Sequence, residues 1–338
     1  MVSIYDLASW AGVAPSTVSK ALRDDPRISA GTRARIKALA AEAGFTPNSA
    51  AQSLTTRRTM TLGLVVRDYA DPYNGLLMRG IDGAALRAGY QLLVASTHEA
   101  GERELSDIAL LFRQRRVDGM IVVASHADEH RAQLDPSVPV VFVADHPELV
   151  PDRPNASLVT FGESAAAQAA TRHLIGLGHR RIAYVGLERA FTSNDNRRRG
   201  YEAALRAAGI EPDPRLIVAS TRRDAIAAGA EGVELALPAA PTGLLCYNDL
   251  VAISGIRTLL DQGIRVPEDM SVMGFDDLEI SALITPPLTT MSQPRQEMGR
   301  IATEQLLAMI RGEAGRVRVD TACTLVVRRS TAAPRHDV

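Results

Sequence analysis

From Thr61 onward, short apolar runs alternate with longer amphipathic stretches, and this alternation limits the fold more strongly than any other feature of the sequence. The runs have the length of β-strands, and the stretches between them, such as GLLMRGIDGAALRAG and RELSDIALLFRQRR, have helical periodicity. Strands that alternate with helices form parallel sheets with helices on their faces. The predicted strands are TLGLVV, YQLLVAS, GMIVVAS and VPVVFVA, then SLVTF, RIAYVG, LIVAS, GLLCY and MSVMGF.

These strands form two sets, and the second set is expected to begin near Ser157. Two sets predict two α/β subdomains, and the proline-containing stretch 147–154 is the expected place of the first crossing between them. A chain of 338 residues with 46% hydrophobic residues is long enough for two or three domains.

The N-terminal segment predicts three short helices instead. Gly12-Val13 interrupts a first helical pattern, and Pro15 suits the first turn of the next helix, because a proline lacks only an N–H that would be unpaired there. Ser29 is placed to cap a third helix. A helix, a tight turn and a second short helix can enter a DNA major groove. The residues expected to face the helical core are Ile4, Leu7, Ala8, Ala11, Val18, Ala21, Leu22, Ile36, Leu39, Ala40 and Ala43.

The charges are unevenly divided along the chain. Residues 1–58 hold eight Lys and Arg against four Asp and Glu, which gives this end +4, and the remainder carries −5 within a total of −1. A basic end on an acidic body is typical of a nucleic-acid-binding domain joined to a solvated core, although chance alone could also produce it.

The sequence also predicts the compartment. Cys246 and Cys323 lie in apolar runs, and we expect both to be buried thiols. No residue before Lys20 is basic and no apolar segment follows Met1, so no signal peptide is expected. The longest apolar runs have strand length and cannot span a bilayer. We therefore expect a cytoplasmic protein without a membrane partner.

Several motifs resemble those of one known family. The N-terminal segment contains YDLA, AGV and TVSKAL, and PN-xx-AQSL follows at 47–54. Further along lie GHRRIAYVG at 178–186, NDLVA at 248–252, MSVMGFDD at 270–277 and PPLTTMSQP at 286–294. In these motifs and their order the sequence is similar to the LacI family of transcriptional regulators, from about Ser3 to Ser330.

This resemblance implies an α/β core of two doubly wound parallel-sheet subdomains, periplasmic-binding-protein-like, with an N-terminal all-α helix-turn-helix domain. It places a DNA-binding headpiece at 1–46, a hinge segment at 47–59 and an effector-binding and dimerisation core at 60–330. The chain would cross between the subdomains three times. The first subdomain would comprise about 60–156 and 287–318, and the second about 157–286 and 319–330. Ligand would lie between them, outside the carboxyl ends of the strands.

The resemblance also implies the DNA contacts. Lys20, which could otherwise be an ordinary solvated lysine, is expected to contact the operator, and Pro15 and Ser16 to tune the preferred sequence. Hydroxyl groups would bind phosphate oxygens, which fixes register without reading sequence. The hinge, whose composition also fits a plain linker, would become helical only when paired on DNA, with Leu54 entering the minor groove. The expected DNA contacts are Tyr5, Pro15, Ser16, Thr17, Ser19, Lys20, Ser29, Thr32, Asn48, Ala51, Gln52 and Leu54.

Seven matched positions are expected to bind the effector. An arginine, an asparagine and an aspartate can pair with several hydroxyl groups at once, which is the chemistry that a sugar requires. An alternative role of Asn248 and Asp276 is to cap helices, because each follows a predicted strand, and capping and ligand binding can both hold for one residue. The expected effector contacts are Arg197, Asn248, Asp276 and Gln293, with Asp71, Tyr73 and Ser193 as weaker candidates.

The sequence departs from the family pattern at two positions. Ala144 intervenes before Asp145, which puts a ligand contact of Asp145 in question. Arg295 stands where many relatives have an aromatic or apolar residue, so it either adds charge to the pocket or faces away.

The expected function is that of a ligand-responsive, DNA-binding regulator. It would be a homodimeric repressor that a small sugar-like effector, a carbohydrate, releases from double-stranded, near-palindromic operator DNA. A corepressor-dependent regulator with a nucleobase-like ligand is the alternative. No apolar heptads follow the last strand, so a dimer is expected rather than a tetramer, with helix 295–311 at its interface.

Two other classes of protein share parts of this sequence pattern. A solute-binding protein would share the core but would lack residues 3–58. A metal-dependent hydrolase would rest on HADEH at 126–130, which matches an inverted zinc-protease pattern but has no evident third ligand. The sequence contains no phosphate-binding loop and no complete dinucleotide fingerprint. We therefore expect no enzyme activity, no cofactor and no metal.

Overall fold

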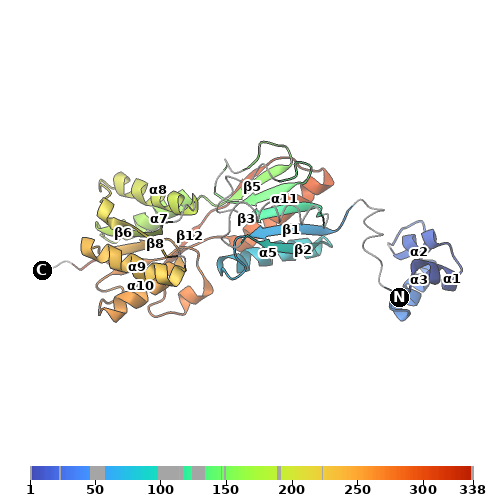
Figure 1. Ribbon diagram of the computed structural model, residues 1–338, viewed down its shortest axis with the longest axis horizontal. Coiled ribbons are helices and arrows are strands. Elements are labelled where there is room, and N and C mark those ends of the chain that lie inside the picture. The colour runs from blue at the N-terminus through green and yellow to red at the C-terminus, as the bar shows by residue number, and fades with distance from the viewer. Residues whose placement is uncertain are drawn as a thin grey trace. The chain divides into compact units, whose positions relative to one another are not determined.

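The chain divides into two compact units, Met1–Met60 and Thr61–Val338 (Figure 1). The computed structural model describes residues 2–22, 24–45, 58–97, 114, 117–123, 134–145, 147, 150–188, 192–222 and 224–335. The expected hinge contacts Asn48, Ala51, Gln52 and Leu54, the HADEH motif and most of RELSDIALLFRQRR lie outside these ranges.

The described part of the first unit consists of three helices, as predicted: α1 (Ile4–Ala11), α2 (Pro15–Leu22) and α3 (Ala30–Glu42). Ser3 caps α1 in a capping box with Asp6, and Gly12 ends α1 with a positive φ of 63°. The predicted cap of α3 is confirmed, since the Ser29 side chain accepts a hydrogen bond from the backbone N–H of Thr32. Of the predicted core residues, Leu7, Ala8, Ala11, Val18, Ala21, Ile36 and Ala40 are buried, and Ile4, Leu22, Leu39 and Ala43 pack partly buried against them.

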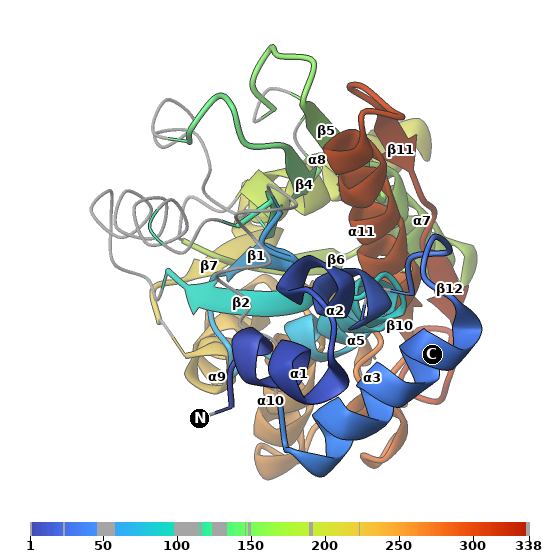
Figure 2. The ribbon, with the colours of Figure 1, turned by 90° about the vertical axis from the view of Figure 1, so that its right-hand side faces the viewer.

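The second unit begins with a sheet of six parallel strands in the order β11-β5-β4-β3-β1-β2 (Figure 1). Helices α5 (Tyr73–Arg87) and α11 (Arg295–Arg311) lie side by side, and both pack against this sheet (Figure 2). The strands are β1 (Thr61–Val66), β2 (Gln91–Ser96), β3 (Gly119–Val123), β4 (Val140–Val143), β5 (Ala156–Thr160) and β11 (Arg318–Asp320).

Two glycines allow α5 and α11 to pack closely. A Cβ atom on Gly80 would lie 2.0 Å from the carbonyl oxygen of Gln296. A Cβ atom on Gly299 would lie 2.2 Å from the carbonyl oxygen of Leu77. The apolar face of α11 is buried within the chain, so a dimer interface on this helix would use its other face, and the predicted interface stays a prediction.

The second sheet has four parallel strands in the order β7-β6-β8-β9. Helices α7 and α8 pack on one face and α9 and α10 on the other (Figure 1). The two faces bury different clusters, so the sheet is covered on both sides as predicted for a doubly wound fold. The elements are α7 (Glu163–Gly176), β6 (Ile182–Leu187), α8 (Thr192–Ala207), η3 (Pro214–Leu216), β7 (Ile217–Ser220), α9 (Ala225–Ala236), η4 (Leu237–Ala239), β8 (Gly243–Cys246), α10 (Asp249–Asp261), β9 (Ser271–Met273) and η5 (Glu279–Ala282).

The crossings between the sheets come later in the chain than predicted. Strand β5, which was expected to open the second set, pairs with β4 and β11 in the first sheet. The first crossing is therefore at 161–162, not at 147–154, and the boundary near Ser157 is wrong. Strands β10 (Thr290–Ser292) and β12 (Thr324–Val326) pair antiparallel, which moves the other crossings to 293–294 and 321–323. Ordinary strand periodicity does not say which sheet a strand will join.

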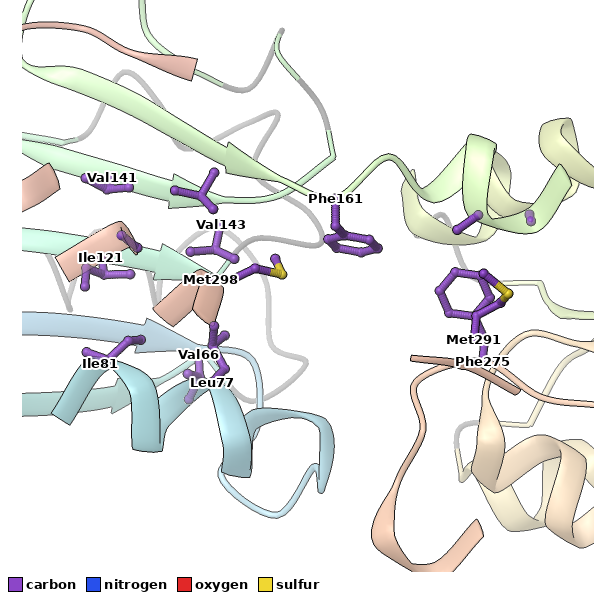
Figure 3. Close-up of a cluster of buried hydrophobic side chains, with 14 of the residues drawn as sticks. Val66, Leu77, Ile81, Ile121, Val141, Val143, Phe161, Phe275, Met291 and Met298 are labelled. Carbon is purple, nitrogen blue, oxygen red and sulfur yellow. The ribbon is translucent and has the colours of Figure 1, made fainter. Parts of the chain in front are cut away.

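An apolar cluster runs from the first sheet to the second. Figure 3 shows Val66, Ile121 and Val143 in the first subdomain, Phe161 at the crossing, and Phe275 beside Met291 on the far side. All of these side chains belong to one buried cluster, so the subdomains share an apolar contact at the crossings.

The expectation that both cysteines are buried is only partly met. Cys246 is buried, but Cys323, at the third crossing, is half-buried. In the described part of the chain, no helix combines the length and apolar character that a bilayer span would need.

Candidate functional site

Four of the predicted effector residues meet where the two subdomains join. Tyr73 begins α5, Arg197 lies in α8, Asp276 follows β9, and Gln293 lies at the second crossing. The Tyr73 hydroxyl donates to Gln293 Oε1 at 2.9 Å, and Gln293 Nε2 donates to Asp276 Oδ1 at 2.7 Å. Arg197 Nη2 lies 3.7 Å from the same Asp276 oxygen.

Arg197 is the centre of this arrangement, and its side chain is 5% exposed. Its Nη2 donates to Glu163 Oε1 at 3.1 Å, and its Nη1 donates to the carbonyl oxygen of Tyr247. Its guanidinium carbon lies 4.0 Å from the ring centroid of Phe275 and 4.7 Å from that of Tyr247. The Nε atom is buried and has no hydrogen-bond partner among the described residues. We call the set Tyr73, Gln293, Asp276, Arg197 and Glu163 the junction network.

Glu163 is a member of this network that the sequence did not identify. It is the first residue of α7, directly after the first crossing, and it is buried. Asn196 Nδ2 donates to its Oε2 at 3.3 Å. Burial raises the pKa of the Glu163 carboxyl, and the neighbouring Arg197 charge opposes this rise. The signal in the sequence is that Glu163 is an acidic residue shortly after a predicted strand. That strand, β5, was expected in the second sheet but belongs to the first, so Glu163 was not predicted at the junction.

Asp276 does not cap a helix, so that alternative is wrong. Its φ of 119°, followed by 57° at Asp277, places two consecutive residues in conformations that non-glycine residues rarely adopt. The short helix that follows is capped by Leu278 instead. Burial raises the pKa of Asp276 to about 8, against the opposing effect of Arg197. The hydrogen bond from Gln293 and the nearby Arg197 hold this carboxyl inside the junction network in spite of the unusual backbone conformation.

Arg295 lies beside the network and does not face away. Its side chain is 2% exposed, and its Nη2 donates to the carbonyl oxygen of Asp277 at 2.9 Å. Its guanidinium carbon lies 5.5 Å from the Tyr73 ring centroid. Arg295 therefore belongs to the junction between the subdomains, although it begins α11 on the first sheet.

The other predicted effector residues have separate partners. Asn248 caps α10, where its side chain accepts from the backbone N–H of Val251 at 2.9 Å, so its capping alternative is confirmed. Ser193 Oγ lies 3.0 Å from the Tyr247 hydroxyl, which places it near Arg197. Asp71 accepts from the backbone N–H of Tyr73 at 3.0 Å. These contacts place Ser193 and Asp71 next to the network and leave Asn248 at its edge.

The Asp145 side chain forms hydrogen bonds with the residues of the first crossing. Its side chain accepts from the backbone N–H groups of Gly162 at 3.0 Å and Glu163 at 2.7 Å, and from the Thr160 hydroxyl. A carboxylate at a helix N-terminus is favourable there because the exposed N–H groups carry positive partial charge. Asp145 therefore fixes the position of Glu163.

The described DNA-binding candidates lie on or near the surface of the first unit. Tyr5 is 72% exposed and Ser16 is exposed, and Pro15, Thr17, Ser19 and Lys20 are half-buried. The hydroxyls of Ser29 and Thr32 are 2.8 Å apart at the start of α3. Hydroxyl groups at a helix N-terminus are suited to a phosphate oxygen. No group of three His, Cys, Asp or Glu side chains in the described ranges could hold a metal ion.

Comparison with known proteins agrees with both units. Residues 3–48 match the bacterial regulatory proteins of the lacI family, and residues 171–331 match the periplasmic binding protein-like domain. The chain is 32% identical to the HTH-type transcriptional regulator DegA of Bacillus subtilis (strain 168), over 98% of each protein. It is similar to the lac repressor dimer bound to operator and the anti-inducer ONPF, with a TM-score of 0.86, 27% identity, and coverage of 98% of this chain and 99% of that chain. It is also similar to the transcriptional regulator CelR in its cellobiose complex, with a TM-score of 0.73, 29% identity, and coverage of 98% of this chain and 100% of that chain. The chain therefore belongs to the lacI family of bacterial regulatory proteins.

Proposed function

We propose that this protein is a homodimeric transcriptional repressor without catalytic activity, and that a small polyhydroxylated effector bound at the junction network releases it from operator DNA. One observation carries the proposal. Hydrogen bonds join Tyr73 on the first subdomain, through Gln293 at a crossing, to Asp276 on the second. A ligand that competes for these groups changes how the two subdomains are held together.

The network has the chemistry to bind several hydroxyl groups. Arg197 supplies only donors, Asp276 and Glu163 supply acceptors when ionised, and Gln293 supplies both. Tyr247 and Phe275 lie against Arg197 and provide apolar surface of the kind that faces the carbon skeleton of a sugar. The similar regulator CelR has been solved in complex with cellobiose, which supports a carbohydrate ligand for this chain.

The DNA-binding role rests on the first unit. Lys20 and Ser16 lie on α2, the second helix of the helix-turn-helix, and we assign them to the operator with Tyr5, Pro15, Thr17 and Ser19. The similar lac repressor has been solved as a dimer bound to operator, which supports a two-fold symmetric complex of this protein with DNA. We assign the linking residues 47–59 to the hinge.

Linkage sets the size of the response. An effector changes DNA affinity only by binding two arrangements of the core with different affinity. A coupling free energy of about 1–3 kcal/mol corresponds to roughly 5–150-fold in operator affinity.

The test begins with selection of an operator from a random duplex library by the full-length protein. Binding of the selected duplex is then followed by fluorescence anisotropy while sugars, sugar derivatives and nucleobases are added. A polyhydroxylated compound that weakens binding supports the proposal, whereas a nucleobase that strengthens binding replaces it with a corepressor mechanism. Asp276→Ala should lose the response. Asp261→Asn, an exposed residue of α10 that pairs with Arg257, is the matched control and should keep it.

A further inference from the structure

Arg295 is buried without a counter-ion. Within the described part of the chain it forms no ion pair, and its side chain donates only to backbone carbonyl oxygens, those of Asp277 at 2.9 Å and Tyr73 at 3.4 Å. Its Nε atom is buried and has no hydrogen-bond partner there. Arg197 is similarly buried but has the carboxyl of Glu163 at 3.1 Å. The two arginines therefore differ in charge compensation.

A buried arginine cannot lose its charge, because its guanidinium stays protonated at any ordinary pH. Buried charges in proteins are therefore normally paired with an opposite charge. The two carbonyl dipoles around Arg295 offset its desolvation only in part. The remaining positive charge is a property of the ligand-free junction that a bound anion would neutralise.

The rest of the junction also favours an anion. Burial raises the pKa of Asp276 to about 8, so this carboxyl is mostly protonated at neutral pH. The remaining buried carboxylate of the network is Glu163, which contacts Arg197 and whose pKa burial also raises. Arg295 begins the long helix α11, whose N-terminus has no side-chain cap and adds positive partial charge.

The two arginines are connected through the same groups. Gln293 accepts from the Tyr73 hydroxyl and donates to Asp276, which lies next to Arg197. The Tyr73 ring lies against the Arg295 guanidinium. The Tyr73 phenol interacts electrostatically with Asp276 and Glu163 and, more weakly, with both Arg197 and Arg295, so the two arginines act on one position in the junction network.

From this we infer that the effector carries an anionic group, a carboxylate or a phosphate, on its polyhydroxylated body, and that Arg295 determines this specificity together with Arg197. The inference rests on the proposed function, because it assigns the ligand class of the same site. Arg295 supplies an unused N–H and an uncompensated charge, and the anionic group accepts from the guanidinium N–H groups of the two arginines. The hydroxyl groups of the ligand bind Gln293, Asp276 and Glu163.

The first experiment needs no variant. Each sugar is tested as a matched set that contains the neutral aldose, its uronic acid, its aldonic acid and its phosphate monoester. Isothermal titration calorimetry measures binding, and release of the selected operator measures response. The acidic members should bind at least about tenfold more tightly than the neutral aldose. Comparison of the affinities of the uronic and aldonic acids with that of the phosphate ester identifies the anionic group as a carboxylate or a phosphate.

The outcomes separate the two proposals. If a neutral sugar releases the operator as well as its acidic counterparts do, the inference about Arg295 is wrong and the proposed function stands. If no member of any set, neutral or acidic, changes operator binding, the proposed function itself fails.

The second experiment changes the charge. Arg295→Gln should weaken binding of the acidic ligand at least about tenfold more than it weakens binding of the neutral aldose, whereas Arg295→Lys should retain part of the preference. Arg300→Gln, on the exposed face of the same helix, where Arg300 pairs with Glu297 and Glu304, is the matched control. Circular-dichroism melting and operator affinity without ligand check that each variant folds. If Arg295→Gln folds and keeps the preference for acids, Arg295 is only a structural link between the subdomains.

Discussion

Replacing Asp276 by asparagine should stabilise the ligand-free protein at neutral pH, although the same change removes a residue of the proposed site. Burial raises the pKa of this carboxyl from its ordinary value of 3.8 to about 8. Between these two values the unfolded chain has lost the proton and the folded chain has kept it, so stability falls as pH rises. Asparagine resembles the protonated acid and has no charge to bury.

The size of the effect follows from the pKa difference. Each pKa unit corresponds to about 1.4 kcal/mol, so a rise from 3.8 to about 8 sets a ceiling of about 6 kcal/mol on the contribution lost with rising pH. Relaxation around the ionised carboxylate lowers what can be measured, and we expect about 1–3 kcal/mol at pH 7.5. The difference should shrink as the pH is lowered toward 3.8 and vanish below it, where the carboxyl is protonated in both the folded and the unfolded chain.

Urea unfolding of the wild type and of Asp276→Asn, measured between pH 4 and pH 8 without effector, tests this expectation. Asp261→Asn, at an exposed position, should show a small difference that does not follow the same pH dependence. If the wild type is the more stable protein at pH 7.5, or if the difference does not close on acidification, Arg197 stabilises an ionised Asp276 and the reasoning is refuted.

Three further predictions concern the headpiece, the helix packing and the assembly. Lys20→Ala should weaken operator binding by about 1–3 kcal/mol in anisotropy titrations, and equal losses on operator and random duplexes would contradict a specific contact. Gly80→Ala should destabilise the core by more than about 1 kcal/mol in urea unfolding, because its Cβ would lie 2.0 Å from the carbonyl oxygen of Gln296; Gly83→Ala, whose nearest neighbour is the flexible Arg87 side chain, is the control. Light scattering at micromolar concentration should give the mass of a dimer, and a stable tetramer would contradict the proposed dimeric repressor.

Local features of the fold could be predicted from the sequence. The headpiece helices are specified by nearby residues, such as the caps Ser3 and Ser29 and the turn at Gly12, so their bounds follow from short-range chemistry. The buried central strands are continuous apolar runs. Strand β11 was missed because it is a short edge strand with two exposed charged residues, Arg318 and Asp320.

The site could be predicted only in part, because its remaining features depend on long-range pairing. Matched motifs identified Tyr73, Arg197, Asp276 and Gln293, and these four residues do meet. The location of Glu163 at the junction depends on the pairing of β5 with the first sheet, which places the crossing directly before this residue. The burial of Arg295 depends on Asp277 and Tyr73, which are far from it in the sequence, so no local pattern could show its missing counter-ion.

The late return of the chain to the first sheet has a consequence for synthesis. Helix α11 covers β3, β4 and β5, and β11 completes the sheet beside β5, yet both elements follow the whole of the second sheet in the sequence. On the ribosome, the apolar surface that Met298, Ala302 and Leu306 finally cover stays open until those residues emerge. The first subdomain to be translated therefore cannot finish folding until the second sheet has been made, and a chain that stalls before Arg295 exposes an apolar sheet face to aggregation or to chaperones.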